Sequence, residues 1–171
     1  MKNKVLGLLM VTLCVIGMSM VAYAAPVTDA HKQCVSNAIR AGAAAHGNAS
    51  ALLDAYNRYF DGERMAALAA RSDWGKLNSK QKRQWVEAAR SFVMNQVVPS
   101  IQKYAGSPIR YLRAVTQGGT VSVVGLVGGN TVTWRLINGQ CRFLDVSVSG
   151  IGSISDFVRS GMVSKERQSS R

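Results

Sequence analysis

Side chains that could do chemistry are few in this sequence and lie far apart. The 171 residues include three cysteines and two histidines. His31 and His46 are fifteen positions apart, which does not fit the short ligand spacings of metal sites, and no cluster of cysteines or carboxylates accompanies them. The nine acidic residues are scattered along the chain. An enzyme would bring together a nucleophile and a base, a metal cluster or paired carboxylates. We therefore expect no enzymatic activity, no metal ion and no cofactor.

The first 24 residues have the pattern of a secretory signal peptide. Lys2 and Lys4 precede an apolar run over residues 5–21, and Ala22-Tyr23-Ala24 is the small-x-small pattern that signal peptidase reads. We expect cleavage after Ala24, which leaves residues 25–171 as a single domain. A retained membrane anchor is the alternative, since the apolar run is about as long as a minimal membrane span.

Two cysteines remain once the signal peptide and its Cys14 are removed. In an oxidising compartment the remaining pair, Cys34 and Cys141, is predicted to form a disulfide that ties the first helix to the last strand. A bridge across so long a loop stabilises the fold by up to about 4.7 kcal/mol on the chain-entropy model. The alternative is two buried free thiols, and in either case these residues are predicted to be structural.

The net positive charge of the chain suggests a negatively charged partner. The net charge is +12, and loss of Lys2 and Lys4 with the signal peptide leaves +10. A cluster of cations with no acid among them opens the longest predicted helix: Lys76, Lys80, Lys82 and Arg83. This cluster is either a solvated face or a docking surface for an acidic partner or an anionic membrane surface. No nucleic acid is expected, because the chain is exported and has no recognition motif.

The elements that must position these residues change in character near residue 105. Before it, apolar residues recur at helical spacing in four predicted helices, and capping residues mark the start of three of them. The predicted helices run from Thr28-Asp29 to about Ala45, from about Ala49 to Tyr59, from a cap at Asp61, and from Asn78 to about Tyr104. Asn78 and Gln81 form a capping-box pair, and Pro99 is expected to kink or break the last helix.

After residue 105 the pattern is that of strands joined by tight turns. The predicted strands cover about 109–116, 120–127, 131–137 and 141–149, linked by Gly118-Gly119, Gly128-Gly129-Asn130 and Asn138-Gly139. These turns are typical of hairpins and fit neither a phosphate-binding loop nor a dinucleotide fingerprint. We therefore expect an α+β fold, in which N-terminal helices pack on the dry face of a four-stranded antiparallel meander and a short C-terminal helix follows.

One acidic residue has a predicted partner on the sheet. Asp145 alternates with Leu144 and Val146, which places it on the opposite face from those apolar residues. Arg135 or Arg142 is expected to pair with it there.

Two stretches of the sequence resemble the MlaC family, also described as toluene-tolerance or auxiliary transport proteins. The first is Phe60-Asp61-Gly62-Glu63-Arg64-Met65-Ala66, with Trp74 after it and Gln81, Arg83 and Trp85 in the long helix. The second is the run from Phe143 to Ile151, with its aspartate-valine pair and final glycine, followed by Asp156-Phe157-Val158-Arg159-Ser160. The similarity spans about residues 50–160, in the same order of helices, meander and helix.

The resemblance implies a non-enzymatic periplasmic lipid carrier that serves outer-membrane lipid asymmetry. Members of the family hold phospholipid acyl chains in a pocket between a curved sheet and covering helices. They shuttle lipid between an outer-membrane lipoprotein complex and an inner-membrane ABC transporter complex, so phospholipid and these two complexes are the implied partners. We expect a monomer that touches membrane surfaces transiently. The expected lipid-binding residues are Met65, Leu68, Phe92, Val93, Val97, Val123, Trp134, Leu136, Val146 and Val148.

Other interpretations stay open at this point. Small residues beside large ones in the meander, such as Gly125 beside Trp134, are compatible with a void or with ordinary close packing. A cationic periplasmic interaction protein without lipid cargo is the main alternative, and a hopanoid-associated relative of the same family is another. The segment around Cys34 has no match to the family, and the polar tail from Ser164 to Arg171 replaces a longer C-terminal helix.

Overall fold

The computed structural model of this chain describes residues 23–45, 47–103 and 106–169. The predicted signal peptide lies outside the described residues except for its last two, Tyr23 and Ala24. The elements in chain order are β1 (Tyr23–Ala25), α1 (Asp29–Ala44), α2 (Ala49–Tyr59), α3 (Gly62–Ala70), a 3-10 helix (Arg71–Lys76), α4 (Ser79–Phe92), a π-helical turn (Val93–Val97), α5 (Val98–Lys103), β2 (Ile109–Gln117), β3 (Thr120–Val127), β4 (Asn130–Ile137), β5 (Phe143–Val148), β6 (Gly152–Ser153) and α6 (Ile154–Ser169). The predicted α+β class is confirmed.

Thr28, Asp61 and Asn78 cap their helices as the sequence predicts, and Asn48 caps α2 as well. Thr28, Asn48 and Asp61 each accept a hydrogen bond from the backbone three residues on, at 3.3, 3.0 and 3.0 Å. Asn78 and Gln81 bond each other's backbone reciprocally, at 2.9 Å in both directions. These caps satisfy amide groups that have no partner within their helix, so the starts of the four helices follow from local chemistry.

The interruption predicted at Pro99 takes the form of a widened turn rather than a break. Residues Val93–Val97 form one π-helical turn, and the helix then continues through Pro99 as α5. Proline has no amide hydrogen and its ring clashes with the carbonyl four residues earlier, so the turn before it must widen.

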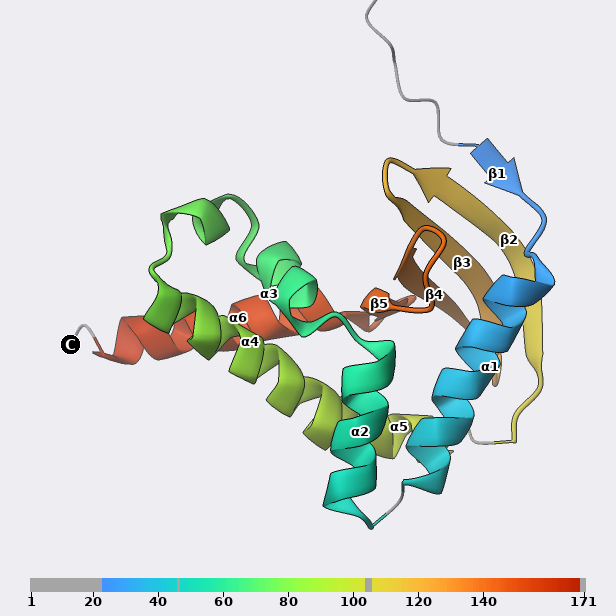
Figure 1. The fold of residues 1–171 in the computed structure, drawn as a ribbon, viewed down its shortest axis with the longest axis horizontal. Helices are drawn as coiled ribbons and strands as arrows, with labels where there is room; N and C mark the ends of the chain where they lie inside the picture. The colour runs from blue at the N-terminus through green and yellow to red at the C-terminus, as the bar shows by residue number, and fades with distance from the viewer. Residues whose placement is uncertain (1–22, 46, 104–105, 170–171) are drawn as a thin grey trace, which may run out of the picture.

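The sheet is a six-stranded antiparallel meander in chain order, β1 to β6. Its four central strands are the predicted ones, and the short β1 and β6 add an edge on either side. β2 contains a bulge between Tyr111 and Arg113, which changes its register against β3. In Figure 1, α1 lies against the sheet, whereas α3, α4 and α6 form a separate group beside it. No helix in the described ranges is long and apolar enough to cross a membrane.

The last helix is longer than the sequence suggested. α6 spans sixteen residues, and most of the polar run that begins at Ser164 belongs to it. The expectation of a short helix with a polar tail was wrong because Ile154, Val158 and Met162 pack inward at helical spacing, so the polar residues after them can continue the helix.

The predicted disulfide is present and the free-thiol alternative is excluded. Cys34 on α1 and Cys141 just before β5 are bonded, with their Cα atoms 5.4 Å apart and a separation of 107 positions in sequence. The bridge therefore holds α1 against the sheet, as expected.

Candidate functional site

The ten residues predicted to bind lipid do not form one cluster. Val123, Trp134 and Leu136 belong to a core between α1 and the sheet, here called the sheet core. Met65 and Val93 belong to a second core formed by α2, α3, α4, the π turn and α6, here called the helical core, with Phe92 and Val97 half-buried against it. The candidate site is the contact between these two cores.

The sheet core is built mainly of branched side chains under α1. The described members buried in it are Cys34, Val35, Ala114, Val121, Val123, Val127, Trp134, Leu136 and Phe143. Val123, Leu136 and Phe143 are at most 2% exposed. Trp134 lies 6.3 Å from the ring of Tyr111, whose hydroxyl donates to the backbone oxygen of Lys32 on α1. The dry face of the sheet is thus covered by α1, the helix that carries Cys34.

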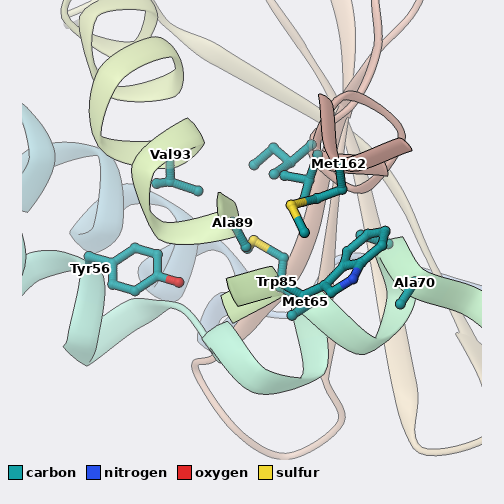
Figure 2. Packing of buried hydrophobic residues seen from close by; sticks show 11 residues of the cluster. Tyr56, Met65, Ala70, Trp85, Ala89, Val93 and Met162 are labelled. Atoms are coloured by element: carbon teal, nitrogen blue, oxygen red, sulfur yellow. The ribbon is translucent and has the colours of Figure 1, made fainter. Parts of the chain in front are cut away.

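The helical core contains small and flexible side chains around one indole. Figure 2 shows Met65, Trp85 and Met162 converging in it, with Ala89 and Val93 along α4 and the π turn. Four alanines line it, at positions 66, 69, 70 and 89. The hydroxyl of Tyr56 is buried there without a hydrogen-bond partner among the described residues, and burial raises its pKa to about 12.

The two cores meet along a seam at the corner between α2 and α3. Phe60 and Val146 pack against both cores. The ring of Phe60 lies 5.5 Å from that of Tyr56 on one side and 5.5 Å from that of Phe143 on the other. Of the predicted lipid residues, Val146 lies on this seam, and Val97 and Phe92 are half-buried against the helical core. The seam is the boundary marked by Phe60 and Val146.

Arg142 fixes one side of the seam. Its guanidinium donates to the backbone oxygens of Asn57 at 3.1 Å and Phe60 at 2.7 Å, both at the C-terminal end of α2. The amide of Asp61 donates to the backbone oxygen of Phe143 at 3.0 Å. A cation that bonds free carbonyls at the end of a helix is favourable, because those groups lack partners and carry partial negative charge. The start of β5 is therefore tied to α2 beside the seam.

The remaining two predicted lipid residues lie apart from the cores. Leu68 on α3 is half-buried and belongs to neither cluster. Val148 pairs with Val132 at the end of β5 and borders a polar hollow of about 790 Å³ on the other face of the sheet. A second hollow, of about 240 Å³ between α1 and α2, has mostly alanine walls and is bordered by Tyr59, which also packs on the sheet core.

The cationic cluster at the start of α4 is partly compensated, contrary to expectation. Lys76 lies 3.6 Å from Asp73 in an exposed ion pair, and the ammonium of Lys82 lies 5.3 Å from the ring centre of Trp74. Asp73 precedes the cluster by one turn of the 3-10 helix, so it does not interrupt the run of cations in the sequence. Lys80 and Arg83 are exposed and have no ion pair within the described residues.

Asp145 is held by a serine and not by an arginine. It is 8% exposed and accepts hydrogen bonds from the Ser155 hydroxyl at 2.6 Å and the Ser155 amide at 3.2 Å. Arg142 is engaged with α2 instead. The predicted pairing was wrong because the chain turns back after β5 and brings the start of α6 to this carboxylate, which alternation along a strand does not reveal.

No group of three or more histidine, cysteine or acidic side chains in the described ranges could hold a metal ion. His31 lies on α1 with a buried Nδ1, and His46 lies outside the described residues.

Comparisons with known proteins support the arrangement of helices and meander. The chain is similar to a solved structure of the phospholipid-binding protein from Ralstonia solanacearum in complex with a phospholipid, with 16% sequence identity and a TM-score of 0.60. This match covers 79% of this chain and 87% of that chain, and at this identity it shows a shared fold. None of the curated proteins compared with the chain matches it. The family described as MlaC protein matches residues 32–160, so the segment around Cys34, which was expected to lie outside the resemblance, belongs to it together with every central strand. Because this match extends over well more than half of its length, the chain belongs to the MlaC family.

Proposed function

We propose that this protein is a periplasmic phospholipid carrier that takes up acyl chains along the seam and shuttles them between membrane transport complexes. Two findings support phospholipid as the cargo. MlaC proteins are periplasmic, non-enzymatic lipid carriers. The Ralstonia protein that shares the fold was determined with a phospholipid bound.

The observation that carries the proposal is the division of the interior into two cores that meet at the seam. Each core is packed around its own buried side chains, so the boundary between the cores can widen while the packing inside each core is kept. Phe60 and Val146 contact both cores at that boundary, and Phe92 and Val97 are half-buried against the helical core. Binding sites for small molecules are usually 300–1,000 Å³ and mostly apolar. The apolar hollow of about 240 Å³ is smaller than this, so uptake of a lipid requires the seam to open.

The helical side is the wall expected to move. It contains a π-helical turn at Val93–Val97, whose Val93 is buried in the helical core. It also contains Met65 and Met162 in the core and Met94 at its margin. Methionine has three rotatable bonds and a polarisable sulfur, so it fills irregular space and adapts to a changed neighbour.

Delivery requires contacts that form and dissociate readily. We propose that Lys80 and Arg83, with Lys76 and Lys82 beside them, dock the carrier on acidic surfaces of an outer-membrane lipoprotein complex and an inner-membrane ABC transporter complex. Exposed charges increase the rate of association more than they strengthen a buried contact.

Export is part of the proposal and alters one edge of the sheet. Cleavage after Ala24 removes Tyr23 and Ala24, which pair with Thr116 and Val115 on β2. The exported carrier then has the free edge of β2 where the precursor has β1.

Lipid extraction from the exported protein tests the cargo directly. Mass spectrometry of the extract should find phospholipid in about molar proportion to protein. Val97→Trp places an indole against the helical core and should remove most of that lipid while the protein remains folded. Val115→Trp, the same change at a half-buried position on the outer sheet face, is the matched control and should retain it. An extract without lipid would contradict the proposal, and polycyclic hopanoid lipid in place of phospholipid would change the cargo.

A further inference from the structure

The bulge in β2 places two arginines on the same face of the sheet. Arg110 lies opposite Leu126 and Arg113 lies opposite Val124 in the β2–β3 register. Residues that oppose one another across antiparallel strands share a face, and positions 124 and 126 share theirs because side chains alternate with a period of two. Arg110 and Arg113 are three residues apart and would face opposite ways in a regular strand. The extra residue, Leu112, brings them together.

A third arginine from β4 joins them. Arg135 lies opposite Ser122 on β3 and opposite Asp145 on β5. Ser122 is two residues from Val124, so Arg135 shares the face of Arg110 and Arg113. The other face of β3 carries Val121 and Val123, which are buried in the sheet core. The three arginines thus lie on the outer face of the sheet, here called the arginine face, and all three are exposed.

The charges of the arginine face have no counterpart among the described residues. None of the ion pairs found there involves Arg110, Arg113 or Arg135. Asp145 is the nearest carboxylate in the register, but it is buried and accepts hydrogen bonds from Ser155. Asp156, at the margin, pairs with Arg71 at 2.8 Å. The face therefore presents net positive charge.

The rest of this face carries hydroxyl groups, the buried Val124, the half-buried Leu126 and Val115, and the exposed Leu112. Thr131, Thr133 and Ser147 form, with Arg135, part of the wall of the polar hollow of about 790 Å³. Leu112, on the bulge between the first two arginines, is 42% exposed. Guanidinium groups bond phosphate oxygens in a bidentate manner, and hydroxyls bond the polar parts of lipid headgroups.

We propose that the arginine face docks this protein on an anionic phospholipid bilayer, with Arg110, Arg113 and Arg135 on headgroup phosphates and Leu112 inserted among them. An acidic protein partner fits less well, because stable protein interfaces have an apolar centre, whereas the large exposed apolar side chains here are Leu112 at the bulge and Ile151 at the margin of the polar hollow. This docking is independent of cargo and uses the sheet surface opposite the core, leaving the α4 cluster free to meet partner complexes.

The test compares two variants that each lose two positive charges. Arg110→Gln with Arg113→Gln changes the arginine face, and Lys80→Gln with Arg83→Gln changes the start of α4. Binding of the exported protein is measured by co-sedimentation with vesicles of phosphatidylglycerol and phosphatidylcholine, and with phosphatidylcholine alone. A basic residue near an anionic surface contributes about fivefold to binding, so the first variant should bind about thirtyfold more weakly. The second should lose less than about fivefold.

Three further results decide the proposal. Wild-type protein should not bind neutral vesicles, and salt should weaken its binding to anionic ones. Arg135→Gln alone should bind anionic vesicles about fivefold more weakly, and this variant tests the proposal if the double variant does not fold. Equal loss in the two double variants, or no binding of wild type to anionic vesicles, would overturn the assignment. Lipid extracted from the Arg110→Gln, Arg113→Gln variant should be unchanged, so a failure of docking is separable from a failure of lipid carriage.

Discussion

The sheet core and the helical core are built and held in different ways. The sheet core packs branched valines and Leu136 against Phe143, with strand ladders on one side and the Cys34–Cys141 bridge to α1 on the other. The helical core packs four alanines and two methionines around Trp85, with no covalent link among its described members. Branched side chains have few rotamers, whereas methionine has many. The first core is therefore the more rigid of the two.

The helical core and its margin contain several irregular features. The π-helical turn lies at its margin, and the Tyr56 hydroxyl is buried in it without a partner in the described part of the chain. Arg71, which ends α3, has a φ of 57°, a left-handed conformation that non-glycine residues seldom adopt. A carrier needs a rigid wall that keeps its shape and a second wall that yields to cargo. The contrast between the two cores supplies both, and three predictions test it.

Loss of the disulfide should have the largest effect and should act on the sheet core. Cys34→Ser with Cys141→Ser is expected to lower the free energy of unfolding by about 2–5 kcal/mol, because the bridge closes a loop of over a hundred residues. Denaturant unfolding measures this, and reduction of the wild type should reproduce it. Hydrogen exchange should rise first in α1 and the strands. A rise confined to α4 and α6 would reverse the assignment of the rigid half.

Arg142→Met should have an intermediate effect, because it cuts the link between the two halves. The side chain donates two hydrogen bonds to α2 carbonyls beside the seam. Charge-assisted bonds of this kind stabilise by roughly 1.5–3 kcal/mol, so we expect a loss of about 2 kcal/mol in thermal or denaturant unfolding. Arg135→Met, on an exposed arginine without an ion pair in the described residues, is the matched control and should change stability by less than about 0.5 kcal/mol. Equal losses would mean that Arg142 does not join the halves.

The smallest effect concerns Tyr56 and Gly62, which lie at the helical core, the less rigid of the two cores. A Cβ at Gly62 would lie 2.6 Å from the Tyr56 hydroxyl oxygen but 3.5 Å from the next ring carbon. Gly62→Ala should therefore destabilise by about 1–2 kcal/mol, as overpacking does. In a Tyr56→Phe background the same change should be neutral or stabilising, because the clashing oxygen is gone and alanine favours a helix. A thermal-unfolding double-mutant cycle gives the coupling, and additive changes would contradict it.

The same tyrosine predicts a dependence of stability on alkaline pH. Its pKa is about 12 in the folded protein, compared with the ordinary tyrosine value of 10.0, which applies to the unfolded chain. Between these values the unfolded chain loses the proton that the folded chain keeps, so stability is full below pH 10 and falls as the pH rises toward 12. Tyr56→Phe should flatten that part of the curve, and it should leave stability near pH 7 almost unchanged because the removed hydroxyl has no partner.

Local features of the fold could be predicted from sequence because local chemistry determines them. Thr28, Asn48, Asp61 and Asn78 each cap a helix through a bond to a residue three positions on. Asparagine-glycine and glycine pairs specify the hairpins in the same way. The Cys34–Cys141 pairing followed by elimination, once a single pair remained.

Long-range features could not be predicted, since periodicity shows which side of an element is buried and not what covers it. The N-terminal helices are predicted to pack on the dry face of the sheet, but α1 covers that face while α4 packs on α3 and α6. Lipid-binding residues chosen for one pocket accordingly fell into two cores. The bulge at Leu112 has no signal in the sequence, and neither does the return of Ser155 to Asp145.

The Cys34–Cys141 bridge also determines what becomes of the protein when its chain is cut. The bond closes a covalent ring that contains α2, α3, α4, α5 and the strands β2 to β4. A protease that cuts an exposed turn such as Gly128-Gly129 or Asn138-Gly139 leaves the two fragments joined through the sulfur atoms. A carrier that has been cut once within this ring still travels as one molecule, and reduction is required before its pieces separate.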